Sequence, residues 1–213
     1  MNDSRFEKLA PLSGLAAVIF MMAGAGVFGV YDYLPSAEKL TDIFSDNPSR
    51  VLLAGYLGLF SAVFFMWFAG SLFSSLRKQE GGSGRLSMTA FGGGIASGIA
   101  MGIGFSAMVS VGARAGAVGG ISAAEAVTQY DIYGTILGQM AAFTLAVLIG
   151  ASGIIFLRTS MVKGWIGWAS VLIAIGLLSP FGYFMLAFAL VWLVWMSFWL
   201  YRQDATHASK RGR

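Results

Sequence analysis

Residues 51–76, VLLAGYLGLFSAVFFMWFAGSLFSSL, contain no charged side chain and are bracketed by Arg50 and Arg77. A helix needs about 20 apolar residues to cross the hydrocarbon core of a bilayer. Only a helix or a closed barrel satisfies its own backbone hydrogen bonds there. The segment meets this length, so it predicts a transmembrane helix.

Other segments of the chain repeat this pattern. Residues 164–201 are charge-free and would measure roughly 55 Å as one helix, which is too long for a single span. Ser179-Pro180 divides them, because Ser favours the N-cap and Pro the first helical position. We therefore expect an all-α, polytopic transmembrane bundle (residues 12–201) with six spans, at residues 12–34, 51–76, 86–113, 130–157, 164–178 and 180–201. The alternative is five spans, with the short fifth segment kinked or re-entrant.

Composition supports a membrane protein. The chain is 57% hydrophobic and 11% charged, against roughly 25% charged residues in a soluble domain. Without cysteine it forms no disulfide and no thiolate metal site. Residues 12–30 could also be a signal peptide cleaved after Ala23-Gly24-Ala25. Their apolar run is longer than usual for a signal peptide, so we expect a retained span.

The basic residues predict the orientation of the chain. Eleven of the 14 Lys and Arg residues fall in the N-terminal tail (residues 1–11), two loops (77–85 and 158–163) and the C-terminal tail (202–213). By the positive-inside rule this side is cytoplasmic. We expect a multi-pass protein of the cell membrane with both termini in the cytoplasm. Five spans would leave the basic C-terminal tail outside. The net charge of +4 then reports orientation, and we expect lipid contacts and no nucleic-acid partner.

Two segments on the opposite side have helical patterns of their own. Residues 36–46 place Leu40, Ile43 and Phe44 on one face, which predicts a short amphipathic helix on the outer surface. Ser122-Ala-Ala-Glu125 fits a capping box and predicts a helix start.

Small residues at i+4 spacing predict where the spans touch, because small side chains let helices approach closely in lipid. We expect these faces in the bundle interior, with the third and fourth spans possible partners. The ridges are Ala54, Gly58 and Ala62 in the second span, Gly94, Gly98 and Gly102 in the third, and Gly134, Gly138, Ala142, Ala146 and Gly150 in the fourth.

The sixth span instead carries an aromatic stripe. We expect a lipid-facing surface with an interfacial anchor at its end, and the alternative is a surface for an apolar ligand or a partner helix. The stripe consists of Phe184, Phe188, Trp192, Trp195 and Trp199.

The predicted span cores lack ionisable residues, which normally mark functional sites in membranes. The strongly polar core side chain is Gln139, expected to bond a neighbouring helix or to line a cavity. The only histidine, His207, falls in the polar tail. The sequence therefore predicts no catalytic, metal or cofactor site, and we expect the protein not to be an enzyme.

One polar constellation remains, at the predicted outer interface. It could form a mouth for a cation or an amine, although tyrosines and carboxylates also mark the interface of membrane proteins in general. Its members are Tyr31, Asp32, Arg114, Glu125, Tyr130 and Asp131.

Three stretches of the chain, residues 67–82, 85–94 and 163–168, resemble a group of small, uncharacterised actinobacterial-type membrane proteins of about six spans. The shared pieces include Trp67 to Leu72, Glu80-Gly81-Gly82, and Lys163 to Trp168. The resemblance implies a six-helix fold in a bacterial inner membrane. It brings no activity and no functional residues.

We expect a non-enzymatic bundle that acts through its neighbours, as an accessory or scaffold subunit or a homo-oligomer. The alternative is a lipid or small-molecule transporter or binding protein with a glycine-lined cavity between the third and fourth spans and an outer acidic mouth, where Asp32 and Asp131 act as gatekeepers. A third hypothesis is an intramembrane enzyme.

Overall fold

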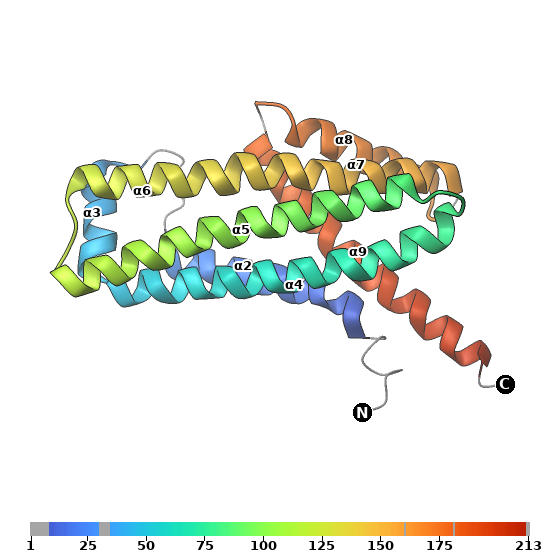
Figure 1. Cartoon of the computed structure of the whole chain (residues 1–213), viewed down its shortest axis with the longest axis horizontal. Coiled ribbons are helices and arrows are strands. Elements are labelled where there is room, and N and C mark those ends of the chain that lie inside the picture. The colour runs from blue at the N-terminus through green and yellow to red at the C-terminus, as the bar shows by residue number, and fades with distance from the viewer. Residues whose placement is uncertain (1–8, 30–34, 160, 181, 212–213) are drawn as a thin grey trace.

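The computed structural model describes residues 9–29, 35–159, 161–180 and 182–211, with side chains described as far as Gln203. These residues form helices and turns and no strand, which confirms the all-α class (Figure 1). The elements are η1 (Ala10–Leu12), α2 (Ser13–Phe28), α3 (Ala37–Asp46), α4 (Pro48–Glu80), α5 (Arg85–Val118), α6 (Ala123–Thr135), the π-helix η2 (Ile136–Ala141), α7 (Ala142–Thr159), α8 (Gly164–Leu177) and α9 (Gly182–Arg211).

Five helices are long and apolar enough to cross a membrane. They are Ala10–Phe28, Pro48–Glu80, Arg85–Val118, Ala123–Thr159 and Gly182–Gln203. The remaining apolar helix, α8, has 14 residues, or about 21 Å, and is shorter than the roughly 30 Å of hydrocarbon in a bilayer. The prediction of several apolar spans is confirmed, and the count of six is not.

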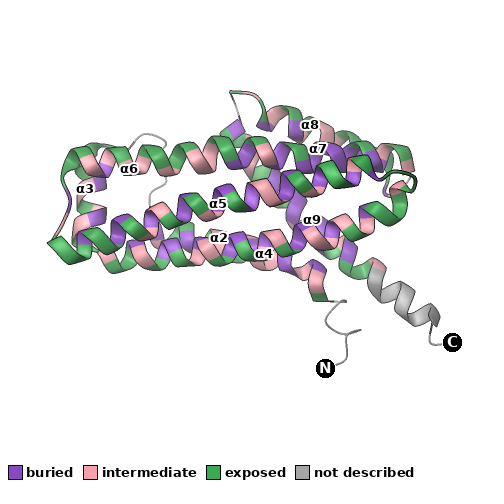
Figure 2. Ribbon diagram, in the orientation of Figure 1, coloured by how far each residue is buried: buried purple, intermediate pink, exposed green. Residues whose placement is uncertain are grey.

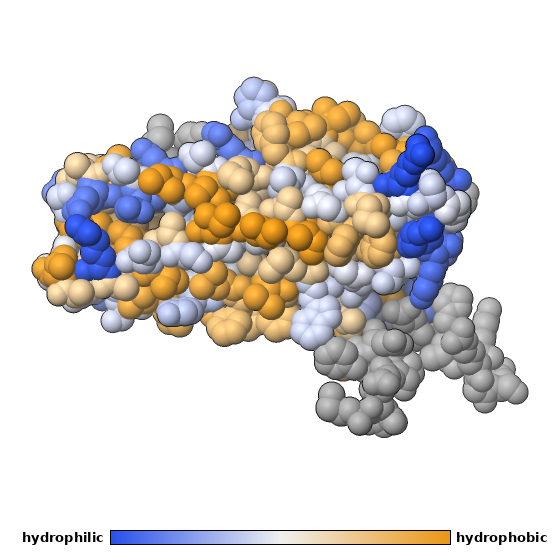
Figure 3. Space-filling model, viewed as in Figure 1, coloured by the Kyte–Doolittle hydropathy of each residue, from blue (hydrophilic) through white to orange (hydrophobic). Residues whose placement is uncertain are grey.

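The long helices lie side by side in the order α2, α4, α5, α7, α8, and α9 crosses obliquely to contact both α2 and α8 (Figure 1). The α4–α5 turn and the end of α9 lie toward one end of the bundle, and α3 covers the other end against α6. On the face shown in Figure 3, hydrophilic side chains gather toward the two ends and apolar ones cover much of the length between.

The helix α5 is central, with buried residues along most of its length (Figure 2). A Cβ added at Gly93 would lie 2.8 Å from the backbone nitrogen of Leu148 and 2.8 Å from the backbone oxygen of Thr144. The backbones of α5 and α7 therefore touch at this point. Close by, Ser97 Oγ donates a hydrogen bond of 2.9 Å to the backbone oxygen of Ala141. Van der Waals contact and hydrogen bonding of this kind hold helices together in lipid.

The predicted ridge of α5 faces α4 more than α7. Gly94 and Gly98 are buried, and a Cβ at Gly94 would lie 2.7 Å from the Cβ of Ala69. Gly98 faces the side chain of Met66, also in α4, whereas a Cβ at Gly102 would meet nothing within 4 Å. The matching ridge of α4 is buried as expected, at Ala54, Gly58 and Ala62.

The predicted ridge of the fourth span is divided by η2. Gly134 is exposed and Gly138 half-buried, and a Cβ at either would meet nothing within 4 Å. Ala142 and Ala146, beyond η2, are buried, and Gly150 faces Ala174 of α8. The prediction of this ridge assumed α-helical spacing throughout. In a π-helix the backbone hydrogen bonds join residues i and i+5, so each turn takes more residues. The first two glycines of the ridge therefore lie on the outside of the bundle instead of the interior.

The local helix signals are confirmed. In α3, Leu40 and Phe44 are buried, and the Ser36 side chain accepts a hydrogen bond from the Lys39 backbone nitrogen at 3.3 Å. At the start of α6 both halves of the Ser122 and Glu125 capping box are formed.

The predicted break near Ser179-Pro180 is also present, but its details differ. The helix α8 ends at Leu177 and α9 begins at Gly182 instead of Pro180. Ser179 Oγ donates to the backbone oxygen of Gly176 at 2.6 Å. The hydroxyl therefore closes the end of α8.

The contact at Gly93 can be tested by substitution. Gly93→Ala should destabilise the protein by about 1–3 kcal/mol, because the added methyl group overlaps the backbone of α7. The matched control is Gly92→Ala, since a Cβ at Gly92 would meet nothing within 4 Å. Thermal unfolding in detergent measures both variants. Equal melting temperatures for the two would contradict the backbone contact.

Candidate functional site

Three regions could carry function: the polar cluster at the α3 end, a groove between α2 and α9, and the outer face of η2. In the polar cluster, Arg114 and Glu125 form an ion pair of 3.1 Å, with side chains 66% and 44% exposed. Glu125 also accepts hydrogen bonds from the Ser122 backbone nitrogen at 3.1 Å and its hydroxyl at 2.9 Å. The carboxylate therefore has a cation and a helix cap as partners.

The two other predicted members that the structure describes, Tyr130 and Asp131, do not line the space beside this ion pair. The space beside Arg114 and Glu125 measures about 140 Å³, below the roughly 300–1,000 Å³ of a small-molecule site. Tyr130 packs against Tyr133 with ring centroids 6.4 Å apart, and Asp131 is exposed. Tyr31 and Asp32 lie outside the described residues. The Glu125 carboxylate of the mouth is thus already paired with Arg114, which fits a helix cap better than a binding site for a cation.

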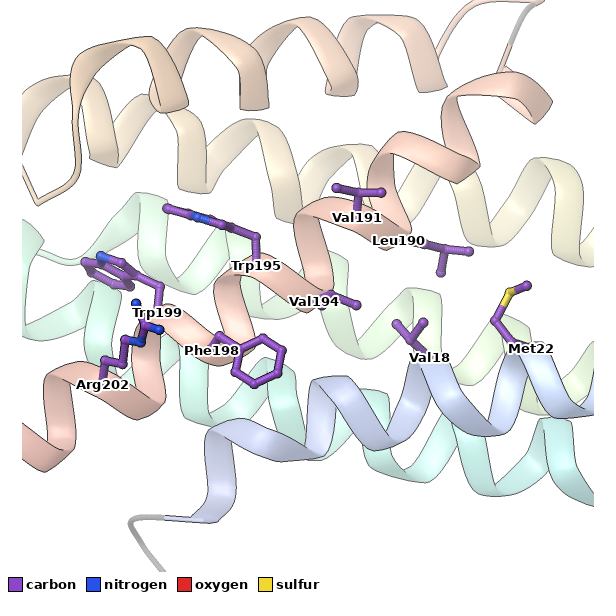
Figure 4. Close-up of a pocket in the computed structure, with 9 residues that line it drawn as sticks. All are labelled: Val18, Met22, Leu190, Val191, Val194, Trp195, Phe198, Trp199 and Arg202. Atoms are coloured by element: carbon purple, nitrogen blue, oxygen red, sulfur yellow. The ribbon is translucent and has the colours of Figure 1, made fainter.

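The groove between α2 and α9 is the larger space, at about 540 Å³ (Figure 4). We call it the α2–α9 groove. Its lining is Val18 and Met22 of α2 and seven residues of α9 between Leu190 and Arg202. The indoles of Trp195 and Trp199 stack with centroids 6.2 Å apart and planes 20° apart.

The aromatic stripe of the last span is therefore divided between different environments. Phe184 and Phe188 are 68% and 55% exposed, as expected of a lipid-facing surface. Trp192 is buried and donates a hydrogen bond of 2.8 Å to Ser170 Oγ in α8. Trp195 and Trp199 line the groove. The sequence signal for this groove was the i, i+4, i+7 spacing of Trp195, Trp199 and Arg202, which places them on one helix face.

The third region surrounds Gln139, which lies in η2. Its side chain is exposed, so it does not line an internal cavity as one prediction had it. Among the residues with described side chains it has no hydrogen-bond partner. Gln139 lies between Leu137, which faces Gly104, and Ala141, which faces Ser97. Both contacts fall within residues 86–113, the charge-free part of α5. We call the zone of the bundle at the depth of such charge-free segments the apolar belt, and Gln139 lies at this depth.

Gly134, Thr135, Gly138 and Gln139 together form one surface, which we call the η2 face. The positions of Gly134 and Gly138 leave open space on it, and Thr135 and Gln139 are exposed. The face thus combines room for a close approach with an amide at the depth of the apolar belt.

Comparison of the chain with protein-family models, curated protein sequences and solved structures found no match. By its fold the chain is a helical bundle in which several helices are long and apolar enough to cross a membrane.

The capping role of Ser122 can be tested in the polar cluster. Ser122→Ala removes the N-cap acceptor of α6 and should lower the free energy of unfolding by about 1 kcal/mol. The control is Ala124→Ser, at an exposed position two residues further along the chain. It should change the free energy of unfolding little. Hydrogen exchange of the first turn of α6 reports the local effect. Unchanged protection in Ser122→Ala would contradict the cap.

Proposed function

We propose that the protein is a non-enzymatic membrane scaffold that associates with a second copy of itself through the η2 face. The observation that carries the proposal is an open Gly134-x-x-x-Gly138 pair beside Gln139, whose amide has no hydrogen-bond partner among the described side chains. Two glycines four residues apart on an apolar helix are a known association motif, because they let another backbone come close.

The amide of Gln139 supports the same conclusion independently. A polar group facing hydrocarbon without a hydrogen-bond partner is costly. A primary amide both donates and accepts, so two copies related by a two-fold axis can bond each other reciprocally. The π-helix that carries Gln139 is also a rare structure found frequently at functional sites.

The transporter alternative has less support. It depended on a glycine-lined cavity between the third and fourth spans. In the structure α5 and α7 are in backbone contact at Gly93, and Gln139 points out of the bundle.

The topology we propose keeps both termini in the cytoplasm, on the basic side. Four elements cross fully, namely α2, α4, α5 and the continuous α6–η2–α7 helix. The helices α8 and α9 then form a hairpin that enters and leaves on the basic side. Support comes from Ala174, near the end of α8, which packs on Gly150, nine residues and roughly 14 Å before the end of α7. The helix α9 runs obliquely (Figure 1), so its long apolar segment reaches no deeper into the membrane than the shorter α8 in this topology.

The topology can be tested in intact cells, because the chain contains no cysteine. A single cysteine at Ser179, in the α8–α9 turn, should resist a membrane-impermeant maleimide both before and after lysis. Ala123→Cys should react in intact cells, and Ser83→Cys, in the α4–α5 turn, only after lysis. Labelling of Ser179→Cys in intact cells would show a complete crossing by α8, and early labelling of Ser83→Cys would show the opposite orientation.

Association can be tested by filling the η2 face. Gly138→Ile should weaken dimerisation in vesicles at least about tenfold, because the side chain holds the backbones apart. Gln139→Leu should weaken it about three- to tenfold through the lost interhelical hydrogen bonds. The control is Gly26→Ile, at an open glycine of α2. Single-molecule photobleaching counts the copies. A monomeric wild type, or equal effects of Gly138→Ile and Gly26→Ile, would refute the proposal.

A further inference from the structure

The α2–α9 groove has apolar walls and a cation at one end. Of the nine side chains in Figure 4, Arg202 is the charged one. Val18 and Met22 lie toward the other end, and Val194 lies between the two ends (Figure 4). The groove is therefore amphipathic along its length.

Arg202 lies where a lipid headgroup would be. It is the first charged residue after the apolar run that ends at Tyr201, and Trp199 lies one turn before it. Tryptophan concentrates at the depth of the headgroups. Arg202 is exposed, and among the side chains that the structure describes it has no hydrogen-bond or ion-pair partner. A guanidinium binds phosphate through two parallel hydrogen bonds.

The rest of the groove suits an acyl chain. Its volume of about 540 Å³ falls within the roughly 300–1,000 Å³ of small-molecule sites. The stacked indoles of Trp195 and Trp199 offer a flat apolar wall, and Val194 continues it toward α2 (Figure 4). A soluble phosphate compound would use the cation alone, whereas a phospholipid uses both the cation and the walls.

We propose that the α2–α9 groove binds one anionic phospholipid of the leaflet on the basic side. Its phosphate group pairs with Arg202, and one acyl chain lies past Val194 toward Val18 and Met22. This site is separate from the η2 face, so it stands whether or not the protein self-associates.

The experiment is native mass spectrometry of the full chain in detergent, titrated with phosphatidylglycerol and with phosphatidylcholine of the same acyl chains. Wild type should bind the anionic lipid more tightly. Arg202→Gln should weaken the binding of phosphatidylglycerol about fivefold, the contribution of one basic residue near an anionic membrane surface, and leave the binding of phosphatidylcholine unchanged. Val194→Trp should weaken the binding of both lipids by filling the groove. Arg158→Gln, at an exposed cation of the same end but outside the groove, should change neither.

Three results would overturn the proposal. Wild type could bind both lipids equally, or Arg202→Gln and Arg158→Gln could weaken phosphatidylglycerol alike, which would indicate a general surface charge effect. Alternatively, Val194→Trp could leave lipid binding intact and abolish a dimer, which would show that a second copy fills the groove. If Val194→Trp fails to fold, Val191→Trp, at a lining position 68% exposed, tests the same point.

Discussion

Helices in a bilayer gain little from burying apolar side chains against one another, because the surrounding lipid is equally apolar. The bundle therefore depends on how closely α5 approaches its two neighbours. Gly93 brings the backbone of α5 onto that of α7, and Gly55 and Gly112 do the same between α4 and α5. The order of the helices follows from these contacts, and so does the placement of the surfaces left outside them.

Polar groups inside the bundle have partners of their own. Ser61 of α4 donates to the backbone oxygen of Ala17 in α2 at 2.8 Å, and Trp192 of α9 donates to Ser170 of α8 at 2.8 Å. No buried side-chain nitrogen or oxygen of the described residues lacks a hydrogen bond. Gln139 differs, because it faces outward at the depth of the apolar belt. This contrast is the reason for looking to a second copy of the chain for its partner.

Features that depend on neighbouring residues could be predicted from the sequence. The capping box at Ser122, the amphipathic α3 and the break near Ser179 depend on side chains a few positions apart, and all are present. The burial of the α4 ridge could be predicted as well, because α4 is a regular α-helix. The orientation of Gly134 and Gly138 could not, because the π-turn of η2 changes the helical phase and leaves no recognised mark in the sequence. The spacing of Trp195, Trp199 and Arg202 indicates one wall of the α2–α9 groove, but the groove itself could not be predicted, since it depends on the oblique crossing of two helices distant in the chain.

The central claim is that small residues of one helix serve two purposes, with Ala142 and Gly150 packed within the bundle and Gly134 and Gly138 open toward a second copy. Oxidative cross-linking in native membranes tests it most directly. Thr135→Cys places a thiol on the η2 face and leaves both glycines and Gln139 intact, and Ala25→Cys places one on the exposed side of α2. The account predicts a covalent dimer from Thr135→Cys and none from Ala25→Cys. No dimer from Thr135→Cys, or equal amounts from both, would contradict it.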